Sequence, residues 1–210
     1  MEPITSLPQG RPTDYRYAMA MKIVGLAGRP GSGKSAVARI LTVSSGIEWI
    51  DLDRVAWETY ASGTETFDRV VERFGEGVLA EDGEIDRGEL AVRVFLDPEA
   101  KSDLEAIVHT AVVDRLETLC EAQRERGKQI LLVEGALLTS SPYVDRSIFD
   151  ALLWLDADDA VREERLRAEG RADHVARGDD VLPGDDVVVI DAVGTIDDVA
   201  ERVRARIAEL

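Results

Sequence analysis

One short stretch, Gly28-Arg29-Pro30-Gly31-Ser32-Gly33-Lys34-Ser35, sets the architecture expected of this chain. It satisfies the pattern G-x-x-x-x-G-K-S of a phosphate-binding loop. An apolar run, Ile23 to Ala27, precedes the loop, and a helical pattern, Ala36 to Leu41, follows it. A strand that leads through such a loop into a helix aims backbone N–H groups and the positive helix end at a phosphate. The sequence therefore predicts a nucleoside-triphosphate site at this turn.

Each residue type in the loop suits that chemistry. The glycines let the backbone curl with its amides pointing inward, where a Cβ would obstruct the phosphate. Lys34 can reach the β- and γ-phosphates, and the Ser35 hydroxyl can ligate Mg²⁺. The predicted ATP-binding residues are Gly28, Arg29, Pro30, Gly31, Ser32, Gly33, Lys34, Ser35 and Ala36.

The composition excludes several other classes of protein. A net charge of −17 over 210 residues argues against a general nucleic-acid or anionic-membrane binder, because both need a broad cationic face. No apolar stretch approaches the length of a membrane span. Cys120 is the only cysteine, which suits a reducing compartment, and its helical setting predicts a small core residue. Residues 1–20 contain three prolines and no signal-peptide core, so they are expected to be a disordered extension.

Apolar runs alternate with helical patterns along residues 21–210, which are expected to form one domain built around the phosphate-binding loop. Strands are predicted at 23–27, 46–51, 129–134, 151–155 and 187–190, and this alternation is typical of a parallel five-stranded sheet wrapped by helices in a three-layer α/β fold. The helical block 54–126 is too long for one crossover and is expected to be an inserted acceptor-binding region. The polar, irregular segment 170–184 is expected to be a lid.

Acidic residues follow two of the predicted strands. Asp51 and Asp53 end the second strand, on the side where open α/β sheets bind ligands. If the chain stays extended there, both carboxylates lie on one side, and either could orient an attacking hydroxyl and accept its proton. Asp53 could instead cap a helix that starts at Arg54. Glu134 ends the third strand and could hold Mg²⁺ through water or bond to the next turn.

Arginines gather before and within the segment 170–184. An arginine-bearing lid would exclude water and stabilise transition-state charge, and Arg165 and Arg171 are the preferred candidates. Arg162 and Arg165 also lie three or four residues from acidic side chains, where surface ion pairs are common and weak. Of the two histidines, His109 lies within a helical pattern, where a structural role is common, and His174 lies in the expected lid.

Taken in order, these motifs resemble the dephospho-coenzyme A kinase family of P-loop kinases. The resemblance runs from about residue 21 to 203. It is carried by the loop, Asp51-Leu52-Asp53-Arg54, Phe74-Gly75, the segment Asp82-Gly83-Glu84-Ile85-Asp86-Arg87, His109, Val133-Glu134-Gly135, Arg165-Leu166 and Val189-Ile190-Asp191.

The resemblance implies transfer of the ATP γ-phosphoryl group, with Mg²⁺, to the 3′-hydroxyl of dephospho-CoA. A cytoplasmic location, consistent with the cysteine usage, and a monomer or small homo-oligomer are further expectations. Asp53 falls on the position of the family's catalytic base. Arg87 and His109, with Glu134 nearby, fall on the acceptor side, and Arg165 falls at the lid base.

Some positions depart from the family pattern. Glu169 stands where a second lid-base arginine is usual, unless Arg167 or Arg171 replaces it, and Ala192 stands where an asparagine is usual. Two alternatives therefore stay open: a kinase of the same fold that acts on another nucleotide or small alcohol, and a catalytically weak nucleotide-binding homologue.

Overall fold

A computed structural model describes residues 21–43, 46–135, 138–139, 144–171 and 182–210. Its centre is a parallel sheet made of β1 (Lys22–Ala27), β2 (Ile47–Asp51), β3 (Ile130–Glu134), β4 (Ala151–Asp156) and β5 (Val188–Asp191). The strand order is β2-β3-β1-β4-β5, and every pairing is parallel. The predicted five-stranded sheet is confirmed, with each strand within two residues of its expected bounds.

The register of the sheet brings the functional ends of its strands together. Glu134 of β3 lies opposite both Asp51 of β2 and Leu26 of β1. Because the carboxyl ends of parallel strands meet at one edge, the loop after β1, the end of β2 and the end of β3 share that edge.

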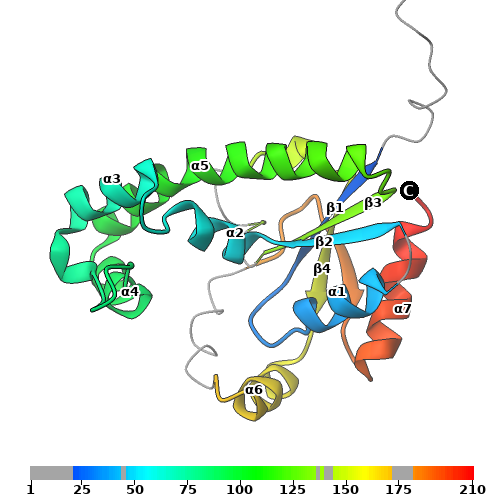
Figure 1. Cartoon of the computed structure of the whole chain (residues 1–210). Coiled ribbons are helices and arrows are strands. Elements are labelled where there is room, and N and C mark those ends of the chain that lie inside the picture. The colour runs from blue at the N-terminus through cyan, green and yellow to red at the C-terminus, as the bar shows by residue number, and fades with distance from the viewer. Residues whose placement is uncertain (1–20, 44–45, 136–137, 140–143, 172–181) are drawn as a thin grey trace, which may run out of the picture.

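Helices cover both faces of the sheet. α1 (Lys34–Thr42) and α7 (Ile196–Ile207) lie on one face, and α5 (Pro98–Glu125) lies along the other (Figure 1). α1 and α7 bury side chains such as Val37, Leu41 and Val203 against the strands, and α5 contributes Leu116 and Cys120 to a second cluster. The expectation that Cys120 is a core residue is confirmed, since 5% of it is exposed.

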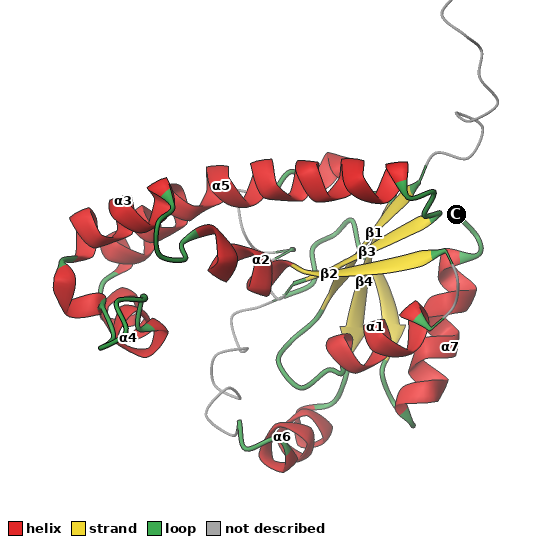
Figure 2. Ribbon diagram, in the orientation of Figure 1, coloured by secondary structure: helices red, strands yellow, loops and turns green. Residues whose placement is uncertain are grey.

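The block between β2 and β3 folds around a core of its own. It comprises α2 (Leu52–Thr59), α3 (Glu65–Phe74), a 3₁₀ turn (Glu76–Val78), α4 (Arg87–Leu96) and the first half of α5. α3 and α4 lie beyond the edge of the sheet, beside the part of α5 that extends past it (Figure 2). Their buried side chains form a third cluster made of Tyr60, Val70, Phe74, Val78, Ile85, Leu90 and Ala100.

The ends of α5 follow from local sequence. Asp97 caps it by accepting from the backbone N–H groups of Glu99 and Ala100, and Pro98 occupies the first turn, where its missing N–H costs nothing. Gly127, just beyond the last turn, has a φ of 71°, the left-handed conformation that glycine adopts without strain. In the described part of the chain, α5 and the other helices are too short or too polar to cross a membrane.

Candidate active site

The phosphate-binding loop joins β1 to α1, as predicted. Gly28, Gly31 and Gly33 all have positive φ values, 147°, 80° and 97°. Gly33 is the N-cap of α1 and has no side chain that could bond to the first-turn N–H groups, and no acidic residue lies in that turn. The helix therefore presents backbone donors and its positive end to an anionic ligand.

Lys34 is held inside the curl of the loop. Its ammonium donates to the carbonyl oxygens of Gly28, at 2.8 Å, and Arg29, at 3.1 Å. Burial lowers the pKa of this ammonium, and the negative charges of Glu134 and Asp53 oppose that effect. Lys34 thus lies among the acids from β3 and α2, as the expected site requires.

Ser35 and Glu134 form the polar contact between the loop and β3. The Ser35 hydroxyl donates to Oε1 of Glu134 at 2.6 Å, and 5% of Glu134 is exposed. Burial raises the pKa of the Glu134 carboxyl, and its hydrogen bond with Ser35 and the charge of Lys34 partly counter this.

These two residues suit a Mg²⁺ ion. Oε2 of Glu134 is buried and has no hydrogen-bond partner among the described residues. The described residues contain no group of three or more acidic, histidine or cysteine side chains that could hold a metal ion. Mg²⁺ commonly takes one or two protein oxygens and completes its shell with water and substrate phosphates, so the Ser35 hydroxyl and the Glu134 carboxylate fit it without a larger cage.

Asp51 and Asp53 do not share one extended strand. β2 ends at Asp51, and α2 begins at Leu52, two residues earlier than expected. The side chain of Asp51 accepts from the backbone N–H of Arg54 at 3.1 Å and caps α2. The alternative in which Asp53 caps the helix is wrong, because the helix starts before it and Asp51 takes that place.

Asp53 lies in the first turn of α2, at the same edge of the sheet as the loop. Its charge acts on both Lys34 and Glu134. The structure therefore brings Asp53, Lys34 and Glu134 together, whereas the cap contact occupies Asp51.

α6 (Asp159–Ala168) supplies an arginine whose role the sequence did not reveal. The ion pair with an acid three residues away, which the spacing suggested, is present, but only 1% of Arg162 is exposed, so its guanidinium is buried rather than at the surface. Its Nε donates to the carbonyl oxygen of Pro30 at 2.9 Å and its Nη1 to Asp159 at 2.6 Å. The available signal was its spacing, because Arg162 and Leu166 are the two buried positions of α6 and lie four residues apart.

Arg165, predicted at the lid base, contacts the same loop from the next turn of α6. Its Nη1 donates to the carbonyl oxygen of Ser32 at 3.1 Å, and its Nη2 lies 3.4 Å from that of Ala192. Ala192, where the family pattern has asparagine, thus meets Arg165 through its backbone.

Arg171 follows α6, and its charge acts on Lys34. Its Nη1 lies 3.3 Å from Oε2 of Glu169, the acid at the expected lid-base arginine position. The rest of the expected lid up to residue 181, with His174, lies outside the described residues, as do residues 1–20.

The two residues expected on the acceptor side come from α4 and α5. The Arg87 guanidinium stacks over the Trp57 ring, 4.4 Å from its centroid. Trp57 lies four residues after Asp53 on α2, so both side chains belong to one face of that helix. His109 of α5 and Leu52, which precedes Asp53, line a common pocket. α2 thus carries both Asp53, whose charge acts on Lys34, and Trp57, which contacts Arg87.

Comparison with known proteins gives one consistent family. The family model described as dephospho-CoA kinase matches residues 22–177. A dephospho-CoA kinase of Geobacter sulfurreducens is 37% identical over 147 residues, which cover 70% of this chain and 74% of that protein. One of Corynebacterium jeikeium is 39% identical over 146 residues, covering 70% and 73%.

A solved structure extends the similarity beyond the matched sequence. The crystal structure of TT1252 from Thermus thermophilus superimposes with a TM-score of 0.73 at 29% identity and covers 90% of this chain and 98% of its own. The fold similarity therefore includes most of the chain, while the family model ends at residue 177.

Proposed function

The chain belongs to the dephospho-CoA kinase family, and we propose that it phosphorylates the 3′-hydroxyl of dephospho-CoA with ATP. The observation that carries this proposal is the position of Asp53. Its carboxylate lies near enough to Lys34 to influence the pKa of that ammonium, at the edge of the sheet where the loop presents its phosphate donors.

The proposed reaction is an in-line displacement. Asp53 accepts the proton of the 3′-hydroxyl, the hydroxyl oxygen forms a bond to the γ-phosphorus, and the bond from that phosphorus to the β,γ-bridging oxygen breaks. The products are coenzyme A and ADP, with the proton first on Asp53. Most of the rate acceleration in such transfers comes from positioning and charge stabilisation.

The donor side is assigned to the loop and its supports. The backbone N–H groups between Gly28 and Ala36, except at Pro30, which has none, and the Lys34 ammonium hold the phosphates. Ser35 would ligate Mg²⁺, and Glu134 would hold it through water. When bound, Mg²⁺ neutralises phosphate charge. Arg165 keeps the loop in place through its contact with the Ser32 carbonyl and, with Arg171, places positive charge beside the transferred group.

The acceptor side is assigned to Arg87 and His109, with Glu134 at its border. Arg87 is held by its stacking on Trp57, on the face of α2 that carries Asp53. The block 54–126 is thus proposed as an acceptor-binding region and 170–184 as a lid.

We further propose that the enzyme acts in the cytoplasm as a monomer or small homo-oligomer on these small-molecule substrates. The single cysteine suits a reducing compartment, and the net charge of −17 disfavours binding to nucleic acid.

A coupled assay of ADP release over an acceptor panel tests the proposal. Dephospho-CoA, AMP, adenosine and a sugar alcohol are offered with ATP and Mg²⁺, and phosphorus NMR locates the new phosphate. Strong acceleration by dephospho-CoA alone, with the phosphate on the 3′-oxygen, is expected. A higher kcat/KM with another acceptor would assign the fold to a different substrate, and ATP binding without turnover on any acceptor would leave only a nucleotide-binding role.

A further inference from the structure

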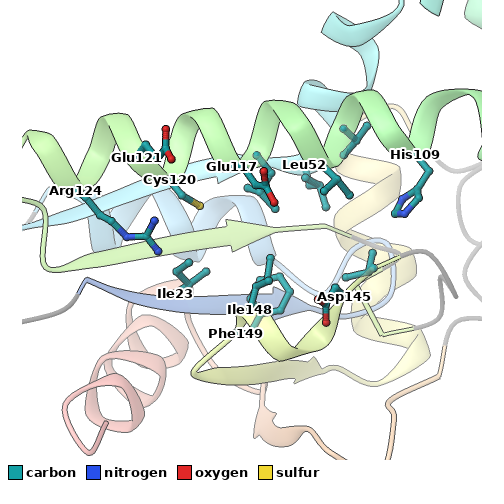
Figure 3. A pocket seen from close by; sticks show the side chains of 14 residues that line it. Ile23, Leu52, His109, Glu117, Cys120, Glu121, Arg124, Asp145, Ile148 and Phe149 are labelled. Carbon is teal, nitrogen blue, oxygen red and sulfur yellow. The ribbon is translucent and has the colours of Figure 1, made fainter.

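A pocket lies between α5 and the sheet, outside the machinery assigned above except for His109. Its volume is about 540 Å³. α5 forms one wall, and Ile23 of β1 and the segment 144–149 face it (Figure 3). Leu52 and His109 both line it, so the pocket adjoins the first turn of α2 and hence Asp53.

The pocket is long and follows the helix. The lining positions of α5 recur at helical spacing from His109 to Arg124, and these two side chains lie at opposite ends of the row (Figure 3). Fifteen residues of α-helix span about 22 Å. Ile23, at the start of β1, lies at the opposite end of the strand from the phosphate loop. The pocket therefore runs from the carboxyl edge of the sheet, near Asp53, back toward its amino edge.

The lining chemistry favours a neutral ligand. The walls are mostly apolar, with side chains such as Val112, Val113 and Phe149. The charged lining residues are Glu117, Glu121, Asp145 and Arg124, an excess of acids that disfavours phosphates and fatty acids. Such a pocket suits a long chain without charge, with a few groups that can hydrogen-bond at its rim.

We propose that this pocket binds the pantetheine arm of the acceptor, an inference that rests on the proposed function. The arm is long, narrow and uncharged, with two amides, a hydroxyl and a terminal thiol, and so matches the shape and charge of the pocket. With the 3′-hydroxyl at Asp53, the arm enters between Leu52 and His109 and extends along α5. The pocket thus gives the enzyme a higher affinity for dephospho-CoA than for adenosine nucleotides that lack the arm.

The test compares two acceptors that differ in the arm. ADP-ribose keeps the adenosine diphosphate and carries a ribose in place of pantetheine. Calorimetry measures the binding of both acceptors, and kinetics measures kcat/KM, in the full-length protein and in Val113→Trp, which fills the pocket from α5. Thr118→Trp is the matched control, because Thr118 lies on the same helix, is exposed and does not line the pocket.

The expected result is selective. The wild-type protein binds dephospho-CoA at least tenfold more tightly than ADP-ribose, and Val113→Trp weakens dephospho-CoA to about the ADP-ribose level while leaving ADP-ribose and the KM for ATP unchanged. Thr118→Trp behaves as wild type. Ile148→Trp, on the facing wall and 39% exposed, repeats the test if Val113→Trp does not fold.

Three results would overturn the assignment of the pocket. They are equal wild-type affinity for both acceptors, equal weakening of both acceptors by the tryptophan variants, and no effect of either variant. If the wild-type protein still binds and phosphorylates dephospho-CoA, any of these results overturns only the assignment of the pocket. Failure of the wild-type protein to bind or phosphorylate dephospho-CoA would overturn the proposed function as well.

Discussion

Asp51 and Asp53 are two residues apart, and the start of α2 between them separates their tasks. The carboxylate of Asp51 is engaged with the backbone N–H of Arg54, so it stabilises the helix that carries Asp53. Asp53, inside the first turn, lies where its charge reaches Lys34. Asp51 thus acts as a positioning residue, and Asp53 is the carboxylate proposed to meet the substrate hydroxyl.

Replacing Asp53 with asparagine should separate catalysis from binding. Asparagine keeps the size of the side chain but cannot take the proton, so kcat should fall by about 10²- to 10⁴-fold. The affinity for ATP should stay within a few fold, because the loop contacts are unchanged. Steady-state kinetics and calorimetric titration with ATP give both values; normal turnover in Asp53→Asn would refute the assignment of the base.

The matched control is Asp51→Ala. It removes the N-cap and should cost about 1 kcal/mol of unfolding free energy in a denaturant titration. Its kcat should fall far less than that of Asp53→Asn. The opposite ranking of the two variants would exchange their roles.

Arg162 carries a second residue-level prediction. Its guanidinium holds the Pro30 carbonyl of the loop, yet its Nη2 is buried without a hydrogen-bond partner among the described residues, which is costly. Arg162→Met should therefore leave the melting temperature nearly unchanged while the KM for ATP rises roughly tenfold, about 1.4 kcal/mol, because the loop loses its support.

Arg167→Met is the control for that variant. Arg167 lies on the same helix, 69% of its side chain is exposed, and its ion pair with Glu163 is long at 3.7 Å. It should change neither the melting temperature nor the KM for ATP. If Arg162→Met lowered only the melting temperature, Arg162 would be a packing residue without influence on the loop.

Between elements, one tight contact of the active site joins the loop to α6. A Cβ built on Gly31 would lie 2.6 Å from the carbonyl oxygen of Arg162, a backbone atom that cannot move alone. The loop and α6 therefore form one unit, and a side chain at residue 31 would push them apart.

Gly31→Ala tests the importance of that contact, and Gly63→Ala is its control. Both glycines have left-handed φ values, 80° and 87°, but nothing lies within 4 Å of a Cβ on Gly63. Each alanine should cost about 1–2 kcal/mol of backbone strain. Only Gly31→Ala should also weaken ATP binding, by tenfold or more, as measured by calorimetry. Equal ATP affinity in the two variants would show that the loop tolerates separation from α6.

Across the chain, features that depend on local sequence could be predicted, and features that depend on tertiary contacts could not. The loop, the five strands and the end of α5 depend on local patterns of glycine, apolar run and cap, and these were predicted within two residues. The start of α2 was placed two residues late, because both Asp51 and Asp53 are good N-caps and only the end of β2 decides between them.

Burial of a charged residue was harder to predict. A chain with 32% charged residues offers many arginines, and only tertiary packing places Arg162 beneath the loop. The pocket under α5 also escaped prediction, because its walls come from α5, β1 and the segment 144–149, which no local pattern joins.

The separate hydrophobic cores predict which parts of the protein unfold independently. The acceptor-binding region is built around its own buried cluster, and α5 is the element that links that cluster, through Ala100, to the core on the sheet, through Leu116. Damage to the acceptor-side core should therefore remain local, in the way that cooperative units of a protein unfold separately.

Leu90→Ala tests this independence. Leu90 is 3% exposed in the acceptor-side core, and its truncation should cost about 2–5 kcal/mol locally. Hydrogen exchange should quicken in α3 and α4 while β1 and β3 stay protected, and the KM for dephospho-CoA should rise while ATP affinity is kept. Leu132→Ala, at a fully buried position of β3 in the core beneath the sheet, should instead quicken exchange throughout. In Leu90→Ala, β1 and β3 could instead lose as much protection from exchange as α3 and α4. Because α5 spans both cores, that result would mean that this helix transmits unfolding and that the two substrate sides cannot be destabilised separately.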